Sequence, residues 1–161
     1  MRILAIDPGP EKSAVLVYDT DEHAPAPQGI LDNGVVRSIV KNADACDVMA
    51  IEMVACYGMG VGKSVFETCV WIGRFIELWG DDDTCRRVYR LEVKMALCHD
   101  SRAKDSNIRQ AIIDRFSATG GGKVPQIGTK AKPGALYGVS GDIWAALGVA
   151  LTTAEKPIES L

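Results

Sequence analysis

The sequence has few of the residues that bind transition metals or form disulfides. It contains two histidines, His23 and His99, and its five cysteines show no C-x-x-C spacing. A structural zinc site needs clustered cysteine and histidine, so this class of site is not expected. An odd number of scattered cysteines is typical of a reducing compartment, and we expect all of them to be small, buried or half-buried thiols: Cys46, Cys56, Cys69, Cys85 and Cys98.

Long hydrophobic runs are missing too. The longest apolar stretches, such as Gly141–Thr152, fall well short of the roughly 18 residues that cross a bilayer. Asp7 interrupts the first ten residues, so they cannot serve as the apolar core of a signal peptide. The 161 residues are 47% hydrophobic and 24% charged, which is typical of globular proteins. We expect one domain over residues 1–161, located in the cytoplasm.

The net charge of −3 conceals an uneven distribution of charge along the chain. Between Arg86 and Lys132, eleven basic residues face four acidic ones, which gives this segment a charge of +7 and the remainder −10. A basic pole on a small domain is compatible with binding a phosphate backbone. It is equally compatible with a solvated helix face next to a polar loop.

The first part of the chain is dominated by predicted strands. Apolar, β-branched runs predict strands over 2–6 and 13–18, joined by the turn Asp7-Pro8-Gly9-Pro10. The Pro-rich stretch 19–28 is predicted as a loop, and 30–36 as a third strand in which Asn33-Gly34 forms a turn or a bulge. A short helix over 38–44 and a buried strand over 47–53 are expected next.

Helices become more frequent in the rest of the chain. Apolar residues at helical spacing predict a helix over Lys63–Trp79 that ends at Gly80. We then expect a strand over 87–91, an amphipathic helix over 106–116, a mobile loop rich in Gly, Lys and Pro over 119–137, and an apolar helix over 143–153. Antiparallel strands followed by strands that alternate with helices predict a single α/β domain.

Three acidic residues occupy positions where carboxylates are costly. Asp7 ends an apolar strand, Glu52 lies within one, and Asp142 begins an apolar helix. Such a carboxylate must be paired, hydrogen-bonded or bound to a cation. A turn explains Asp7 and a helix cap explains Asp142 equally well, whereas neither explains Glu52. Acids from two adjacent strands and a helix can converge on one sheet edge, where their oxygens suit Mg²⁺ or Mn²⁺.

The order and spacing of these residues resemble those of a known family. Asp7-Pro8-Gly9 after a strand, Ala50-Ile51-Glu52 at the end of another and Asp142 before an apolar helix are similar to the RuvC-type Holliday junction resolvases of the RNase H-like superfamily. The likeness covers about residues 2–153 and includes Val93-Lys94 and Arg102-Ala103-Lys104-Asp105 ahead of a helix. The short chain and its loop rich in Lys, Gly and Pro resemble phage-type members.

The resemblance implies an α/β, RNase H-like fold with a five-stranded mixed sheet flanked by helices. It implies a homodimer in which each subunit nicks one strand of a four-way DNA junction, in DNA recombination and repair. Two ions of Mg²⁺ (or Mn²⁺) per site would serve phosphodiester hydrolysis, with Asp7 between both ions, Glu52 on one and Asp142 on the other. This chemistry needs no side-chain nucleophile, in keeping with a sequence that offers no Ser-His-Asp or Cys-His set.

Several further residues are predicted to contact DNA. Tyr57 follows Glu52 by five residues within a glycine-rich stretch, so it can turn toward unstacked bases; burial under the sheet edge is the alternative. Lys94 and Lys104 are predicted phosphate contacts, supported by three more basic residues, with solvated surface side chains as the alternative. The supporting residues are Arg102, Lys130 and Lys132.

The helix over 63–79 displays more apolar and aromatic surface than one sheet face needs to cover. We therefore predict that the homodimer is built mainly on this helix, with Gly73 allowing close approach of the two copies. Burial of the same residues in the core of one subunit is the alternative.

One position departs from the family pattern. RuvC-type enzymes usually carry an acid or histidine three residues before the final aspartate, and here that residue is Val139. If residues 138–141 are helical, one ion has fewer protein ligands and metal binding is weak. If they are not helical, another acid, such as Asp105 or Glu67, completes the site.

Other functions share parts of this pattern. A nuclease that cuts flaps, forks or hybrids would use the same acids, and a junction-binding protein would leave them without chemistry. A kinase-like ATPase also begins with an Asp-Gly turn between two strands, but it needs a second glycine-rich phosphate loop and about twice the length.

Overall fold

A five-stranded mixed sheet forms the centre of the molecule. The computed structural model describes residues 1–58 and 60–156. The strands are β1 (Arg2–Asp7), β2 (Lys12–Asp19), β3 (Ala24–Asp32), β4 (Val48–Met53) and β5 (Cys85–Tyr89). Their order in the sheet is β3-β2-β1-β4-β5. Strand β2 is antiparallel to both of its neighbours, β1 and β3, whereas β4 is parallel to both β1 and β5. This topology confirms the predicted α/β fold with a mixed sheet.

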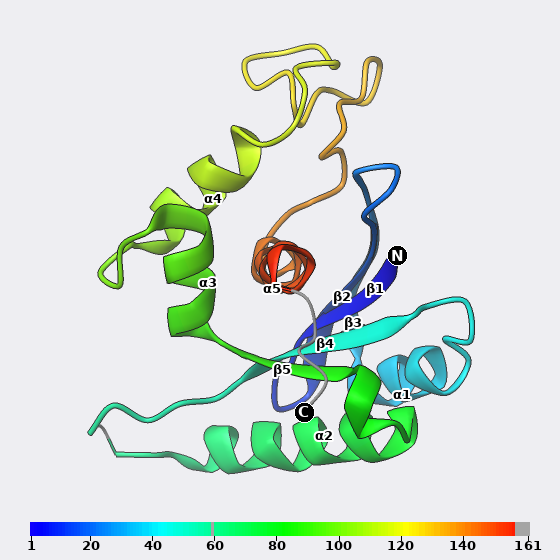
Figure 1. Cartoon of the computed structure of the whole chain (residues 1–161), viewed down its shortest axis with the longest axis vertical. Helices are drawn as coiled ribbons and strands as arrows, with labels where there is room; N and C mark the ends of the chain where they lie inside the picture. The colour runs from blue at the N-terminus through cyan, green and yellow to red at the C-terminus, as the bar shows by residue number, and fades with distance from the viewer. Residues whose placement is uncertain (59, 157–161) are drawn as a thin grey trace.

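Helices cover both faces of the sheet, as Figure 1 shows. One face carries α1 (Asn33–Lys41) and α2 (Lys63–Trp79), and the other carries α3 (Arg90–Cys98), α4 (Asp105–Ile113) and α5 (Ile143–Glu155). A short 3-10 helix, η1 (Asp82–Thr84), precedes β5. Successive side chains of a strand point to opposite faces, so along β1 Leu4 and Ile6 enter the core under α1 and α2, whereas Ile3 and Ala5 enter the core under α3, α4 and α5. None of the helices in the described residues is long and apolar enough to cross a membrane.

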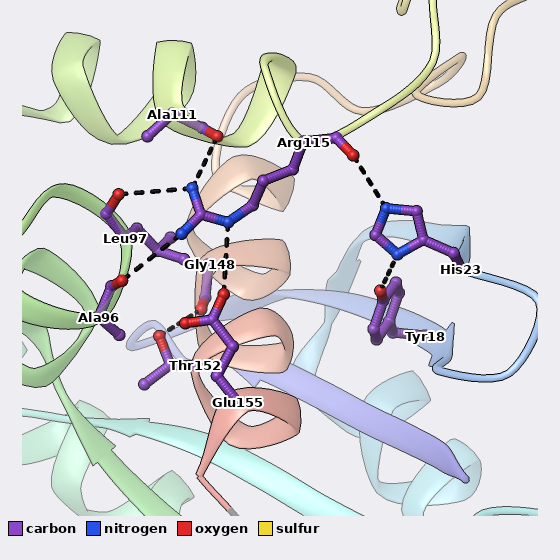
Figure 2. Close-up of polar contacts among 9 residues, drawn as sticks. All are labelled: Tyr18, His23, Ala96, Leu97, Ala111, Arg115, Gly148, Thr152 and Glu155. Atoms are coloured by element: carbon purple, nitrogen blue, oxygen red, sulfur yellow. Dashed lines mark hydrogen bonds and ion pairs between the residues drawn. The ribbon is translucent and has the colours of Figure 1, made fainter.

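Helix α5 is buried along most of its length between the sheet and α3. Gly148 permits this packing, because a Cβ atom there would lie 3.1 Å from Cγ1 of Val93. The hydroxyl of Thr152 donates to the Gly148 carbonyl at 2.8 Å, so this buried polar group is satisfied within the helix (Figure 2). The predicted apolar helix is thus the central helix of its layer, which fixes the position of Asp142 at its start.

Arg115 ties the ends of three helices together on the side away from α2 (Figures 1 and 2). Its guanidinium donates to the carbonyl oxygens of Leu97 at 3.4 Å and Ala111 at 2.9 Å, and its Nε donates to the Glu155 carboxylate at 3.3 Å. The backbone carbonyl of Arg115 accepts a bond of 3.0 Å from Nε2 of His23, in the turn before β3. A cation at helix C-termini is favourable, so this residue stabilises the arrangement of α3, α4 and α5.

Two element boundaries differ from the sequence prediction. The segment predicted as a loop over 19–28 includes the first half of β3. The predicted third strand ends at Asp32, and α1 begins at Asn33, five residues before the helix predicted over 38–44. The predicted strand over 87–91 ends at Tyr89, and α3, which was not predicted, begins at the next residue. The predictions for β1, β2, β4, α2, α4 and α5 are confirmed to within a few residues. The five cysteines are free, but Cys56 and Cys69 are exposed rather than buried or half-buried.

Residues 117–137 form a compact lobe beyond α4 rather than the expected mobile loop. Backbone hydrogen bonds within the lobe hold it together. The amide of Gly120 donates to the carbonyl oxygen of Pro125 at 2.7 Å, and the amide of Gly134 donates to that of Ile127 at 3.0 Å. Gly128 has φ +79°, and a Cβ atom there would lie 2.2 Å from the Gly134 nitrogen, so only glycine fits. Figure 1 places the lobe, in yellow and orange, at the end of the molecule opposite α2.

Candidate active site

The sheet register brings two of the predicted acids to the same edge. In the parallel pair of β1 and β4, Ile6 lies opposite Ile51, so the residues that follow, Asp7 and Glu52, lie side by side near the carboxyl ends of these two strands. Asp7 is half-buried and the Glu52 side chain is mostly buried. Gly9 allows the tight turn after Asp7, because a Cβ atom at that residue would lie 2.3 Å from the Lys12 carbonyl oxygen.

The electrostatics place Asp142 near this pair. Burial, together with the nearby carboxylates of Glu52 and Asp142, raises the pKa of Asp7 to about 7. Burial also raises the pKa of Glu52. Two negative charges beside a buried carboxyl make ionisation of Asp7 costly unless a cation is present. Asp7 therefore lies near enough to Glu52 and to Asp142 for the charge of each to act on its carboxyl group.

The helix cap considered for Asp142 is not observed, whereas Asp7 does lie directly before the turn that joins β1 to β2. Asp142 precedes α5, but its side chain accepts no cap hydrogen bond, so it does not act as a conventional helix cap. Within residues 1–58 and 60–156, no side-chain hydrogen bond within the usual limits engages the carboxylates of Asp7 or Glu52. Glu52 does face a guanidinium, with its Oε1 3.8 Å from Nη1 of Arg90.

Sequence reasoning missed Arg90 as a residue of this site. It was expected inside a strand, but it is the first residue of α3 and its guanidinium pairs with both Glu52 and Asp105. A signal was present: Glu92 lies three residues after Tyr89, and its Oε2 accepts the Tyr89 amide at 2.8 Å, as in a capping box that begins a helix. Asp105, which the sequence offered as an alternative ligand, thus reaches the site through Arg90.

The oxygen-rich donor set suits a hard divalent cation. Asp7, Glu52 and Asp142 offer carboxylate oxygens, and the pKa of Asp7 is raised first by burial and then by the charges of the other two acids. In the described part of the chain, however, no three Asp, Glu, His or Cys side chains are gathered closely enough to form a metal-binding group. The acids interact through their charges without being drawn together.

Val139 does not face this site. It is 4% exposed and packs in the core with α5 and the sheet. Residues 138–141 are not helical, and Gly138 and Gly141 have φ values of +87° and +52°. The helical geometry considered for this segment is therefore wrong, because helix α5 begins only at Ile143.

A cavity beside the acids joins the predicted DNA contacts Tyr57 and Lys94. It has a volume of about 260 Å³ and is lined by Tyr57, Arg90, Leu91, Lys94 and Ser101. Tyr57 is 69% exposed, so the alternative of burial under the sheet edge is wrong. An exposed aromatic ring and two cations around one cavity form a surface that suits a base and its phosphate.

The other predicted contacts lie on two separate surfaces. Arg102 and Lys104 are exposed in the segment before α4. Nε of Arg102 lies 3.9 Å from Oδ1 of Asp100, and the backbone amide of Lys104 donates to Oδ1 of Asn107. Lys130 and Lys132 are exposed in the lobe, which extends away from the sheet and from α2 (Figure 1). The structure therefore brings Tyr57 and Lys94 together but does not place the lobe lysines in the cavity.

Comparisons with known proteins support the fold. No family model and no curated protein sequence matches the chain. Among solved structures, it is similar to RuvC of Thermus thermophilus, with a TM-score of 0.63 and 15% identity over 96% of this chain and 93% of that one. A second structure, T. thermophilus RuvC in complex with Holliday junction substrate, gives a TM-score of 0.62 and 14% identity over the same shares of the two chains. At this level of identity the likeness concerns architecture, and it shows that the chain has the RuvC-type, RNase H-like fold.

Proposed function

We propose that this protein is a metal-dependent endonuclease that resolves four-way DNA junctions by paired nicks. The observation that carries the proposal is that Asp7 and Glu52 occupy neighbouring positions of β1 and β4 in a sheet similar to that of RuvC, with Asp142 near enough for its charge to raise the pKa of Asp7. Similarity to a RuvC structure solved with a Holliday junction supports the choice of substrate. The short chain and its lobe favour a phage-type member acting in recombination and repair in the cytoplasm of a bacterial cell.

In this proposal, Asp7, Glu52 and Asp142 would supply the carboxylate oxygens that hold Mg²⁺ or Mn²⁺. The bound ions would activate a water molecule and stabilise the charge that develops on the leaving 3′ oxygen. The chain's own part is to orient the carboxylates from a rigid sheet edge and helix start, and to hold the scissile strand next to them. Tyr57 and Lys94 bind the strand from the adjacent cavity.

The basic residues outside the cavity would bind the DNA arms. Arg102 and Lys104 lie on the same segment between α3 and α4, and Lys130 and Lys132 extend the basic surface onto the lobe. No acidic residue occurs between Asp114 and Asp142, so the lobe offers positive charge only. Phosphate contacts of this kind weaken with salt, and each lost contact lowers the salt slope by about one.

We further propose that two copies associate through α2, because the two ends of this helix differ in burial. Phe75 is fully buried and the Trp79 indole donates to Thr84 at 2.9 Å, so the C-terminal part is committed to the core of one subunit. Phe66 is 60% exposed and Val70 is also exposed, next to a cavity of about 620 Å³ between α1 and α2. Exposed aromatic and aliphatic side chains on one helix face suit a second copy. Phe66→Ser should convert the dimer to a monomer in sedimentation equilibrium, and a wild-type monomer at micromolar concentration, with and without DNA, would refute this interface.

The test of the function is cleavage of synthetic DNA in Mg²⁺. An intact four-way junction, a three-stranded fork and linear duplex of the same sequence are compared with the wild type and Asp7→Asn, Glu52→Gln and Asp142→Asn. We expect symmetric nicks in the junction alone, and loss of cleavage with retained binding in each variant. Equal cutting of forks and flaps would indicate a broader branched-DNA nuclease. Tight binding without any cleavage would indicate a junction-binding protein.

A further inference from the structure

Arg90 is a cation built into the acidic edge of the sheet. Its guanidinium spans two carboxylates: Nη1 lies 3.8 Å from Oε1 of Glu52, and Nη2 donates to Oδ1 of Asp105. The side chain is 27% exposed, whereas Asp105 projects into solvent at the start of α4. One end of the guanidinium therefore faces the site and the other end faces outward.

The end of the Arg90 guanidinium that faces Glu52 lacks a hydrogen-bond acceptor among the described residues. Nη1 of Arg90 is buried and has no hydrogen-bond partner among the described residues, because 3.8 Å is longer than a hydrogen bond. A buried donor without a partner is destabilising, typically by more than the gain from an ordinary hydrogen bond. The contact with Glu52 is thus a loose ion pair that can be exchanged, whereas the contact with Asp105 is a charge-assisted hydrogen bond.

This position is the one a divalent cation would use. Glu52 is one of the three acids of the proposed metal site, and those acids are not gathered into a metal-binding group in the described residues. A guanidinium beside Glu52 repels a divalent cation at the same carboxylate, since both carry positive charge in a partly buried site. Arg90 also lies where it reduces the repulsion among Asp7 and Glu52 in the absence of metal.

We propose that Arg90 is a resident cation that competes with the divalent metal for Glu52, and that Asp105 retains its guanidinium when the metal binds. The inference rests on the proposed metal site and assigns Arg90 and Asp105 as positioning residues for it. Because Asp105 already binds Nη2, loss of the Glu52 contact does not leave the guanidinium without a partner. The exchange then needs only a small movement of one side chain.

The experiment measures Mn²⁺ binding to the full chain by isothermal titration calorimetry, without nucleic acid. Arg90→Gln should bind Mn²⁺ about tenfold more tightly than the wild type, because one opposing charge near Glu52 is removed. Arg87→Gln is the matched control: it removes the same charge from β5, where Arg87 pairs at 3.6 Å with Asp82 instead. We expect the control to bind Mn²⁺ as the wild type does.

Asp105 is tested through a double-mutant cycle. In a chain that keeps Arg90, Asp105→Asn should weaken Mn²⁺ binding several-fold, because the guanidinium of Arg90 loses Asp105 and turns fully to Glu52. In the Arg90→Gln background the same substitution should have little effect, because its action passes through Arg90. Equal weakening in both backgrounds would overturn the role given to Asp105.

Thermal unfolding supplies a readout independent of calorimetry. Without metal, Arg90→Gln should lower Tm, because the acids lose their internal counter-charge, and Mn²⁺ should raise its Tm more than that of the wild type. Arg90→Lys keeps the charge but not the fork that spans two carboxylates, so it should fold and bind Mn²⁺ with intermediate affinity.

The outcomes separate the inference from the proposed function. If the wild type binds Mn²⁺ and Arg90→Gln binds it no more tightly, the competition is refuted while the metal site stands. If neither binds Mn²⁺, both the competition and the metal-dependent function are refuted. Tighter binding by Arg90→Gln alone, lost again when Glu52→Gln is added, supports the proposal.

Discussion

Asp7→Asn should make the metal-free protein more stable at neutral pH. Burial and the neighbouring carboxylates of Glu52 and Asp142 raise the pKa of Asp7 to about 7 in the folded state. In the unfolded chain, an aspartate has a pKa near 3.9. Between these two values the folded protein keeps a proton that the unfolded chain has released, so the free energy of unfolding falls as the pH rises. Above pH 7 the folded state carries the whole cost of the buried charge.

The size of the effect follows from the separation of the two pKa values. About three pH units at 1.36 kcal/mol each correspond to roughly 4 kcal/mol at pH 8, and to almost nothing near pH 4. Asparagine has nearly the same shape and no charge, so it removes this cost without leaving a cavity. With a urea m-value of about 2 kcal/mol/M, the unfolding midpoint of Asp7→Asn should exceed that of the wild type by about 2 M at pH 8.

Urea unfolding, followed by tryptophan fluorescence in EDTA at pH 4.5, 6 and 8, measures this difference. Asp44→Asn is the control, since Asp44 is an exposed aspartate on a loop before β4 and should leave the pH dependence unchanged. A gain in stability together with loss of cleavage is the pattern expected of a residue kept for function. The reasoning is refuted if Asp7→Asn is no more stable than the wild type at pH 8, or if its advantage does not grow with pH.

Three further substitutions test other parts of the structure by urea unfolding. Val139→Asp places an unpaired carboxylate in the core and should cost about 3 kcal/mol or more, with no improvement in metal binding; a lower metal requirement would mean that residue 139 faces the site. Gly128→Ala should lower the free energy of unfolding by at least about 2 kcal/mol and make the lobe sensitive to proteolysis. Its control is Gly34→Ala on α1, where a Cβ atom meets no neighbour, and this change should be neutral or stabilising. Arg115→Ala should cost about 2–3 kcal/mol, and Arg115→Lys should recover little of it, because only the guanidinium reaches the carbonyls of two helices; full recovery with lysine would contradict this.

Much of the fold was predictable because local pattern and tertiary structure agree there. Helix α2 runs over Lys63–Trp79 as predicted. Its apolar spacing indicates a helix along this segment, and the left-handed cap at Gly80, with φ +77°, determines where it ends. The sequence also indicated that Asp7 and Glu52 belong to two adjacent strands, and the register of β1 and β4 places them near the carboxyl ends of both. These are features that a short window of sequence contains.

The boundary between β3 and α1 depends on contacts that no short window contains. Two prolines argued against a strand, but β3 is an edge strand, where a missing amide donor is tolerated. Asn33 suggested a turn, yet it is buried and starts a helix, with its Oδ1 accepting from Ser13 at 2.6 Å and its Nδ2 donating to the Gly9 carbonyl at 2.9 Å. These partners lie more than 19 residues away in sequence, so only the folded chain selects the helix.

The same reasoning explains why the acids of the site were found and its cation was not. A carboxylate in an apolar strand stands out in a sequence because its burial is costly wherever it goes. An arginine in a basic segment does not stand out, and Arg90 acquires its meaning only when β5 ends next to Glu52 and α4 presents Asp105. The need for a counter-charge is therefore a property of the fold: Asp7 and Glu52 lie partly buried on neighbouring strands, and the chain supplies a cation from the first residue of α3. We therefore expect the affinity of these carboxylates for a divalent cation to depend on a residue that is not a ligand.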